Sequence, residues 1–390
     1  MISVEQALTH VFDLVHPMPV EIVPLGRAAG RVLAQTVTAR RDQPPFPASA
    51  MDGYAVRDAD AAPGAVLTVI GEAAAGSRFA GPVGPRQAVR IFTGAPVPEG
   101  ADRIVIQEDT DRDGDRITLK PTLDPQHYIR PAGTDFAIGT QLTAPRRLGP
   151  TDVALLAAMN IAEVPVARRP VVALMATGDE LVMPGETPSP DQIVASNTFG
   201  LNAMAKAAGA QVRVLPVARD NLASLRAAFG LATDADLIVT IGGASVGDHD
   251  LVAPAADGLG LQRAFYKIAM RPGKPLMAGR LGRSAMLGLP GNPVSSMVCG
   301  QLFMVPLLGA MLGLGAHPAA RRTIPLARDI AANGPREHYM RARLSDAGIV
   351  ALDRQDSSLL SVLVAADALL VRPVDDGPRR AGEFVEYIPL

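Results

Sequence analysis

The sequence of 390 residues has a single cysteine, no tryptophan and only 4% aromatic residues. One cysteine excludes a disulfide framework and a zinc site built from several cysteines within the chain. That residue, Cys299, lies in an apolar run, where a small packed side chain is expected. The scarcity of aromatic rings argues against the stacking platforms that hold single-stranded nucleic acid.

An excess of charge is also missing, because 37 basic residues nearly balance 39 acidic ones and leave a net charge of −2. Such a chain has no global field that attracts nucleic acid or a membrane surface, so we expect neither as a partner. The N-terminus lacks the basic-then-apolar pattern of a signal peptide, and residues 3–6 resemble the capping box of a helix. These features favour a cytoplasmic protein in which anion binding is local.

One apolar stretch, residues 294–316, approaches the ~20 residues that a membrane span needs. It contains Ser295, Ser296 and Gln301, and it follows a Pro-Gly-Asn-Pro turn directly. We therefore expect a buried helix that covers a sheet rather than a membrane span.

A chain of this length holds two to four domains at ~100–200 residues each. Between residues 171 and 289, apolar strand-like runs alternate with segments of helical spacing at 199–208 and 222–231. The predicted strands are Val171–Met175, Val212–Val217, Leu237–Ile241 and Ala285–Leu289. This alternation is typical of a parallel, doubly wound α/β sheet. Short strands between Gly/Pro turns predict β domains at 45–139 and after Pro318, and helical spacing returns at 151–159.

Three Gly/Pro-rich loops follow apolar runs, at residues 242–250, 270–275 and 289–296. A Gly-Gly pair brings bare backbone amides close to a ligand, and amides at a helix start bind anions. The candidate binding residues in these loops are Gly242, Gly243, Ser245, Pro290, Asn292, Pro293 and Ser295. The loops predict a phosphorylated ligand at the carboxyl edge of the sheet, although an ordinary strand–helix connection is the alternative for the last of them.

Acidic side chains accompany these loops. Glu180 follows the strand at 171–175, where a solvated turn is the alternative, and Asp220 precedes a helix that it would equally well cap. Asp248 and Asp250 flank His249, which we expect at the surface rather than on zinc. Carboxylates beside an anion cradle suit Mg²⁺, which would bridge Asp248 and Asp250 to a phosphate.

Basic side chains follow in the next loop, where Lys267, Arg271 and Lys274 lie close together in the sequence. Three such cations suit an oxyanion or a phosphate, and ordinary surface charge is the alternative. In the β region, Asp52, Thr93 and Asp135 lie in turns that contain glycine. Taken alone, such turns more often have a structural role.

Six of these segments, in their order along the chain, resemble the molybdopterin molybdenumtransferases, a family that includes bacterial MoeA and the E domain of gephyrin. The segments are Ser49–Val56, Thr93–Gly100, Thr177–Leu181, Gly242–Asp250, Pro272–Pro275 and Pro290–Ser295. The resemblance implies a multidomain α/β fold with four domains in an elongated homodimer. These would be a linking domain of residues 1–44 plus 140–168, an inserted β-rich domain of 45–139, a molybdopterin-binding α/β domain of 169–318 and a C-terminal β domain of 319–390.

The resemblance also implies an activity in molybdenum cofactor biosynthesis. Molybdenum from molybdate would enter adenylylated molybdopterin while AMP leaves with the help of Mg²⁺, for which Asp220 and Asp250 are the implied ligands. The residues implied as catalytic are Asp52, Thr93, Asp135, Glu180, Asp220, Asp250, Lys267 and Lys274, and Arg271 would join the loop residues in binding substrate. Asp52, Thr93 and Asp135 of one subunit would face the sheet domain of its partner. A molybdopterin adenylyltransferase and proteins that mature molybdoenzymes are the implied partners.

Two positions depart from the family pattern. Arg271 stands where many relatives have lysine, and Asp356 replaces the glycine of a Gln-Gly-Ser stretch, which adds a negative charge where an anion is expected. Two other functions stay open at this stage. One is a molybdopterin adenylyltransferase, which resembles residues 169–318 but lacks the Asp52-type domain, and the other is a non-catalytic pterin-binding scaffold.

Overall fold

The computed structural model describes residues 1–243 and 251–390, and it divides into two compact units. The larger unit contains Met1–Glu21, Gly30–Ala34 and Val166–Leu390, and the smaller contains Ile22–Ala29 and Gln35–Pro165. The predicted residues Ser245, Asp248, His249 and Asp250 lie outside the described residues.

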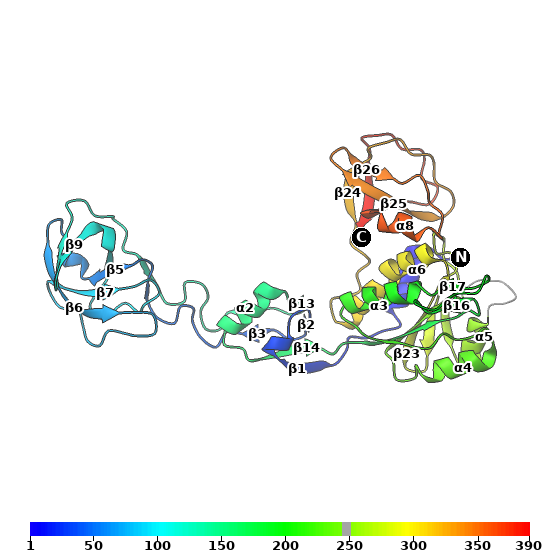
Figure 1. Cartoon of the computed structure of the whole chain (residues 1–390), viewed down its shortest axis with the longest axis horizontal. Coiled ribbons are helices and arrows are strands. Elements are labelled where there is room, and N and C mark those ends of the chain that lie inside the picture. Colours follow the sequence, from blue (N-terminus) through cyan, green and yellow to red (C-terminus); the bar gives the residue numbers. More distant parts are fainter. Residues whose placement is uncertain (244–250) are drawn as a thin grey trace. The chain divides into compact units, whose positions relative to one another are not determined.

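The larger unit is built on a six-stranded sheet with the order β18-β15-β19-β23-β22-β20 (Figure 1). The bounds are β15 Val171–Ala176, β18 Gln211–Val214, β19 Leu237–Ile241, β20 Gln262–Phe265, β22 Met277–Leu281 and β23 Ser284–Leu289. The first four strands in this order are parallel, as predicted. Strands β22 and β20, which were not predicted from the sequence, are antiparallel and extend the sheet beyond β23. The reason is a tight hairpin at Gly282, whose positive φ of 59° reverses the chain between β22 and β23.

Helices cover both faces of this sheet, which confirms the doubly wound prediction. Helices α1 (Val4–Phe12), α3 (Asn197–Ala207), α6 (Pro293–Cys299) and α7 (Val305–Met311) pack on one face, and α4 (Leu222–Gly230) and α5 (Val252–Asp257) on the other. The division follows the alternation of side chains along each strand. Within β15, Val172 and Leu174 join the first core, whereas Ala173 and Met175 join the second.

The apolar stretch after residue 292 forms one long helix, with a π turn at Gly300–Met304 between α6 and α7. Among the described residues, Pro293–Met311 is the one helix long and apolar enough to cross a membrane, and 72% of its most apolar window is buried inside the protein. Its Val294, Val298 and Leu302 belong to the core beneath α3. The prediction of a buried covering helix is therefore confirmed.

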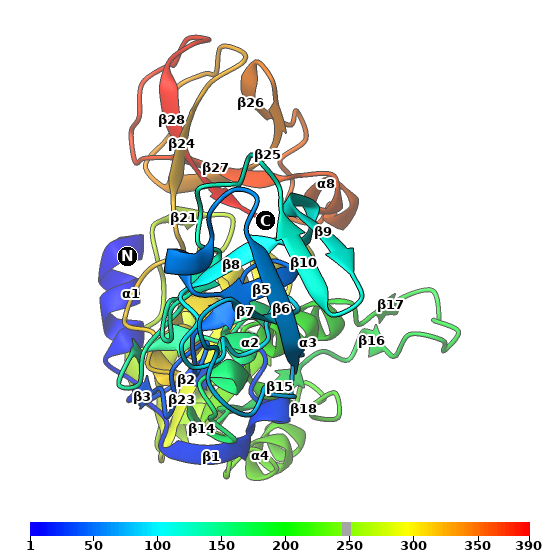
Figure 2. The same ribbon diagram turned by 90° about the vertical axis from the view of Figure 1, so that its left-hand side faces the viewer.

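The C-terminal β domain is a sheet with the order β21-β25-β27-β28-β24, and β26 pairs with β25 (Figure 2). The bounds are β21 Met270–Arg271, β24 Arg322–Pro325, β25 Glu337–Ser345, β26 Gly348–Ala351, β27 Ala368–Arg372 and β28 Phe384–Pro389, with helix α8 at Leu360–Val364. Tyr339 of β25 packs into the core of the long helix, whereas Ala342 faces the domain's own core. Strand β21 lies in the sequence between β20 and β22 of the α/β sheet. A segment of that domain thus forms an edge strand of the C-terminal sheet.

The smaller unit contains a six-stranded sheet with the order β8-β5-β7-β6-β10-β9. The bounds are β5 Gly53–Val56, β6 Val66–Ala73, β7 Gln87–Ile91, β8 Arg103–Ile106, β9 Thr110–Asp113 and β10 Arg116–Leu119. Its two faces hold separate apolar cores, with Tyr54 in one and Ala55 in the other. This agrees with the β-rich composition of the region.

Short elements make up the rest of the chain. The strands are β1 Val20–Pro24, β2 Val32–Leu33, β3 Val37–Thr38, β4 Ala48–Ser49, β11 Ile129–Arg130, β12 Gln141–Leu142, β13 Arg146–Arg147, β14 Glu163–Ala167, β16 Leu181–Val182 and β17 Ile193–Val194. Helix α2 covers Pro150–Ala158, and 3-10 turns lie at Leu25–Arg27, Asp58–Asp60 and Gln107–Asp109.

Leu287 tests the packing of the central strand β23, because its side chain is fully buried. We expect Leu287→Ala to lower the free energy of unfolding by about 2–5 kcal/mol, since it leaves a cavity in a close-packed core. Leu231→Ala is the matched control, because that side chain is 55% exposed at the end of α4. Calorimetry of both variants checks the prediction, and equal transitions would contradict it.

Candidate active site

The register of three parallel strands brings three loops together. Ala176 of β15 pairs with Ile241 of β19, which pairs with Leu289 of β23, so these strands end at one level. The residues that follow them therefore meet at the carboxyl edge of the sheet, where open α/β sheets bind ligands.

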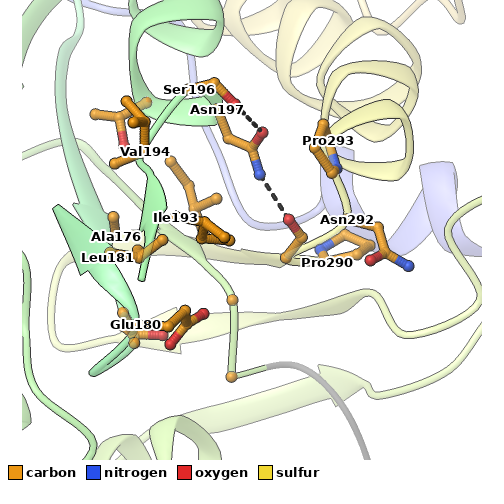
Figure 3. A pocket seen from close by; sticks show the side chains of 18 of the residues that line it. Ala176, Glu180, Leu181, Ile193, Val194, Ser196, Asn197, Pro290, Asn292 and Pro293 are labelled. Atoms are coloured by element: carbon orange, nitrogen blue, oxygen red, sulfur yellow. Dashed lines mark hydrogen bonds between the residues drawn. The ribbon is translucent and has the colours of Figure 1, made fainter. Parts of the chain in front are cut away.

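A cavity of about 810 Å³ opens at this edge (Figure 3). Its lining includes the predicted residues Glu180, Asp220, Gly242, Gly243, Pro290, Asn292 and Pro293. Other lining residues were not predicted, among them Thr177, Leu181, Ile193, Val194, Asn197 and Ser358. The volume lies in the range that small-molecule and cofactor sites occupy.

Packing explains the two glycines of the loop after β19. Gly242 has a φ of +94° and Gly243 a φ of +61°, a region that side chains rarely enter. A Cβ on Gly242 would meet the Thr177 carbonyl oxygen at 2.9 Å, and one on Gly243 would meet a Val252 methyl at 2.2 Å. The sequence analysis explained these glycines only by the close approach of a ligand. The close contacts within the fold already require glycine at both positions.

Thr177 contributes a polar atom that lacks a hydrogen-bond partner in the part of the chain that the structure describes. The side chain is 5% exposed and lines the cavity, and its Oγ1 has no hydrogen-bond partner among the described residues. A buried hydroxyl without a partner costs free energy unless a ligand or water satisfies it. The atom is therefore well suited to contact a bound molecule.

Two carboxylates flank the same edge. The Glu180 side chain folds back over Gly178, where an added Cβ would meet its Oε2 at 2.4 Å. Asp220 also lines the cavity. Asn221 caps helix α4, since its side chain accepts a hydrogen bond from the Ser224 amide at 2.9 Å. The alternative that Asp220 is the N-cap is therefore wrong.

The opposite wall comes from the segment between β16 and α3. Asn197 donates from Nδ2 to the Gly291 carbonyl at 2.7 Å and fixes this wall to the loop after β23 (Figure 3). Ile193 and Val194 of β17 line the cavity although their side chains are 58% and 42% exposed. Exposed β-branched residues next to a cavity give a planar ligand an apolar surface. In the sequence, the prolines near this segment indicated only a loop, so its residues were not predicted to line a site.

Other predicted residues do not line this cavity. They are Lys267, Arg271, Lys274 and Ser295, although Pro275 next to Lys274 does line it. Lys267 lies 5.9 Å from the centre of the Tyr266 ring, Lys274 is exposed, and Ser295 is buried in the first turn of α6. Arg271 lines a different cavity. Arg271 therefore lines a cavity other than the one that Gly242 and Gly243 line.

Buried Arg341 lies next to the segment in which Asp356 replaces the expected glycine. Its Nη2 donates to the Asp356 carbonyl at 3.0 Å, whereas Nε and Nη1 are buried without a partner among the described residues. The Asp356 carboxylate instead accepts from the amide and hydroxyl of Ser358, the latter at 2.6 Å. Asp356 thus uses its charge within its own turn and leaves Arg341 with unpaired donors.

A second polar cluster forms in the smaller unit, where Asp52 precedes β5 and Thr93 follows β7. Because Gly53 of β5 pairs with Ile91 of β7, the two side chains are neighbours although 41 positions separate them. Asp52 Oδ1 accepts from the Thr93 amide at 2.8 Å and from its hydroxyl at 2.7 Å. These bonds hold the pKa of the Asp52 carboxyl below its usual value, with a smaller contribution from nearby Arg90.

Arg90 is a residue of this cluster that the sequence analysis missed. Its guanidinium carbon lies 5.1 Å from the centre of the Tyr54 ring and 4.8 Å from that of Phe92, and Nη1 donates to the Gly53 carbonyl at 3.1 Å. It therefore fixes the start of β5 beside Asp52. The exposed Asp135 side chain, in contrast, makes no hydrogen bond or ion pair with any residue that the structure describes.

Comparison with known proteins covers nearly the whole chain. Residues 2–160 match the model of the MoeA N-terminal region (domains I and II), residues 173–310 a probable molybdopterin-binding domain, and residues 323–390 the MoeA C-terminal region (domain IV). The molybdopterin molybdenumtransferase of Haemophilus influenzae is 34% identical over 400 residues, which are 100% of this chain and 99% of that protein. The chain belongs to the molybdopterin molybdenumtransferase family.

Other relatives support the same assignment. A molybdopterin molybdenumtransferase 2 of Mycobacterium tuberculosis is 36% identical and covers 96% of both chains. The solved structure of a molybdopterin biosynthesis MoeA protein from Pyrococcus horikoshii matches with a TM-score of 0.85 and 30% identity, over 100% of this chain and 99% of that one. The family and the multidomain α/β fold predicted from the sequence are thus confirmed.

The hydroxyl of Thr93 can be tested separately from its amide. We expect Thr93→Val to raise the pKa of Asp52 toward its usual value without fully restoring it, because the backbone hydrogen bond remains. Carboxyl carbon NMR over an acidic pH titration measures this shift. Thr134→Val is the control, since that exposed hydroxyl donates to the Pro131 carbonyl instead. An Asp52 pKa that is the same in all three proteins would contradict the assignment.

Proposed function

We propose that this chain transfers molybdenum from molybdate into adenylylated molybdopterin and that AMP is released in the reaction. The main observation that supports this proposal is the cavity at the carboxyl edge of the α/β sheet, in a chain that aligns over its full length with a molybdenumtransferase. Fold-level likeness alone would not support a reaction, so the proposal depends on the chemistry of the lining residues.

The cavity suits a ligand with phosphates and flat rings. Glycines at 242, 243 and 291 keep backbone groups accessible at its floor, and backbone amides of this kind bind anions. Leu181, Ile193 and Val194 offer apolar surface to a pterin or adenine ring. A ligand here gives the Thr177 hydroxyl the partner that it lacks among the described residues.

The carboxylates present fit Mg²⁺ in its usual role beside phosphates. No group of three or more metal-binding side chains occurs among the described residues, but Mg²⁺ normally takes one or two carboxylates together with phosphate oxygens and waters. We infer that Asp220 and Glu180 hold it, with Asp250 as a further candidate. When bound, Mg²⁺ neutralises the charge of the pyrophosphate and favours departure of AMP.

Molybdate is a dianionic substrate that requires basic partners. Lys267 and Lys274 are the candidates from the sequence, and the unpaired guanidinium donors of Arg341 add a third. Asp52 is ionised near neutral pH, as an aspartate at its usual pKa already is, and the hydrogen bonds from Thr93 lower its pKa further, so it accepts rather than donates hydrogen bonds. We infer that it orients or deprotonates the reacting group together with Thr93.

Two other activities are compatible with parts of the chain. A molybdopterin adenylyltransferase would need only the α/β domain, so the match of residues 2–160 to the MoeA N-terminal region favours insertion. A non-catalytic pterin-binding scaffold would need the cavity but not the ionised Asp52. We further propose a cytoplasmic homodimer that receives its substrate from an adenylyltransferase and passes its product to proteins that mature molybdoenzymes.

The decisive assay combines purified protein, Mg²⁺, molybdate and adenylylated molybdopterin. We expect AMP release that depends on molybdate, together with activation of an apo-molybdoenzyme by the product. In a parallel assay with ATP and molybdopterin as substrates, release of pyrophosphate would instead identify an adenylyltransferase. Ligand binding without AMP release would identify a scaffold.

Single carboxylate variants test the assigned roles. We expect Asp52→Asn to slow AMP release by about 10²–10⁴-fold with little change in ligand affinity, as for loss of a general base. Asp220→Asn should raise the Mg²⁺ concentration required for half-maximal rate. Asp111→Asn and Asp346→Asn are controls, because both are exposed and line neither cavity. Full activity of Asp52→Asn would contradict a catalytic carboxylate.

Mixing Asp52→Asn with Asp220→Asn, at a Mg²⁺ concentration at which neither variant alone releases AMP at an appreciable rate, tests whether catalysis needs both subunits. If Asp52 of one chain acts with Asp220 of its partner, half of the randomly formed dimers contain both variants and one of their two sites is intact. About a quarter of all sites in the mixture are then restored. If both residues act within the same chain, mixing restores nothing. The recovered rate of AMP release therefore distinguishes the two arrangements.

A further inference from the structure

Asp52 is held by two other segments of the smaller unit that meet at its position. Its backbone carbonyl accepts a hydrogen bond at 3.1 Å from the amide of Gln107, which directly follows β8. Its Oδ1 accepts both hydrogen bonds from Thr93, at 2.8 Å from the amide and 2.7 Å from the hydroxyl. The other carboxylate oxygen, Oδ2, makes no hydrogen bond with any residue that the structure describes. One oxygen thus holds the side chain in place, and the other keeps its lone pairs for a ligand.

Arg90 of β7 connects the surroundings of Asp52 through a single side chain. It lies opposite Tyr54 of β5 in the antiparallel ladder. Its Nη1 donates to the Gly53 carbonyl at 3.1 Å, and its Nη2 donates to the side-chain oxygen of Gln107 at 2.7 Å. Gly53 follows Asp52 in the chain, and Gln107 donates its amide to the Asp52 carbonyl. The guanidinium therefore holds both neighbours that determine where the Asp52 backbone lies.

Two aromatic rings restrict the direction of the Arg90 side chain. Its guanidinium carbon lies 5.1 Å from the centre of the Tyr54 ring and 4.8 Å from the centre of the Phe92 ring. Tyr54 is itself held in an apolar core, since its side chain is only 4% exposed. Attraction between a cation and two ring faces limits the freedom of the guanidinium, and its planar fork loses little more on donating hydrogen bonds. The donors of Arg90 are thus aimed before any substrate binds.

No hydrogen-bonded carboxylate neutralises the charge of Arg90. Both of its acceptors are neutral oxygens, and it makes no ion pair with a residue in the described part of the chain. Arg103 on β8 of the same sheet differs, because it donates to the Asp58 carboxylate at 2.9 Å. The charge of Arg90 is therefore available to favour the ionised Asp52 carboxyl, and it lowers that pKa less than the hydrogen bonds from Thr93 do.

We propose that Arg90 is a positioning residue, which keeps Asp52 in the orientation that leaves Oδ2 free to accept a hydrogen bond from the reacting group. This inference rests on the proposed function, and it adds the atom that acts and the residue that holds it. Thr93 contacts the carboxylate directly, whereas Arg90 acts through the Gly53 carbonyl and the Gln107 side chain. A misplacement of about 1 Å can slow a reaction about 10²-fold, so Arg90 affects the reaction without contacting substrate.

Carboxyl carbon NMR of Asp52 in the full chain tests this positioning without any substrate, and Asp52→Asn assigns the signal. Arg90→Lys keeps a positive charge but has no planar fork, so it cannot hold Gly53 and Gln107 in the same way. Arg90→Gln removes the charge as well. We expect the Asp52 signal to shift in both variants, and its pKa to rise more in Arg90→Gln than in Arg90→Lys. An Asp52 signal and pKa that are unchanged in both variants would overturn the proposal.

Steady-state kinetics of AMP release give the second readout. We expect both Arg90 variants to lower kcat by about 10–10²-fold with little change in KM, because a displaced carboxylate is felt in the reaction and not in substrate binding. The loss in Arg90→Lys isolates the geometric effect, since the charge remains. A raised KM with an unchanged kcat would overturn the positioning role, because Arg90 would then act in binding.

Arg103→Gln is the matched control for a purely structural arginine. Arg103 also ties β8 to other segments, since it donates to the Asp58 carboxylate and to the Asp124 carbonyl at 2.6 Å. Neither of these partners makes a hydrogen bond with Asp52. We expect Arg103→Gln to leave the Asp52 pKa and kcat unchanged even where it lowers the unfolding temperature. Equal changes in Arg103→Gln and Arg90→Gln would overturn the proposal, since both would then reflect lost stability.

The two readouts separate this inference from the proposed function. If the intact protein releases no AMP in the presence of molybdate, the proposed function is wrong, and the NMR comparison still decides whether Arg90 positions Asp52. Normal kcat in both Arg90 variants with a shifted Asp52 signal would overturn the inference alone. Variants are compared only where their amide spectra show the native fold, and Arg90→Lys keeps the test decisive if Arg90→Gln does not fold.

Discussion

The common level at which β15, β19 and β23 end is the constraint on which the site depends. Parallel pairing fixes this level, because a slip by one residue would turn every side chain of a strand to the other face. The level in turn decides which loops are neighbours. Thr177 and Gly242 approach so closely that only glycine fits at position 242. The cavity is thus a result of strand register before it is a result of any functional side chain.

The numbers of basic and acidic residues are balanced, so the chain has no global field and its charge is concentrated only locally. Two local charges in this chain illustrate how neighbouring residues set them. Thr93, which follows strand β7, lowers the pKa of Asp52, and Arg341 keeps two buried donors without a partner among the described residues while the Asp356 carboxylate accepts from Ser358. Such arrangements concentrate charge at a few positions without giving the chain a global field.

Much of the architecture could be predicted from the sequence, because buried strands and amphipathic helices repeat with clear periods. Strand β19 was predicted to the residue, whereas β18 ends at Val214 rather than Val217, since Pro216 has no amide hydrogen to donate. Strand β20 was missed because three of its four residues are exposed. The wall residues Ile193 and Asn197, and the neighbours of Asp52, depend on long-range contacts that no local pattern encodes.

Helix α4 begins with two adjacent polar residues that have separate tasks. Asn221 closes the first turn of the helix, and Asp220 lines the cavity. If one aspartate had both roles, a change of ligand chemistry at that position would also remove the helix cap. Here the two roles belong to different residues, so a change of the cavity side chain at position 220 leaves the Asn221 cap in place.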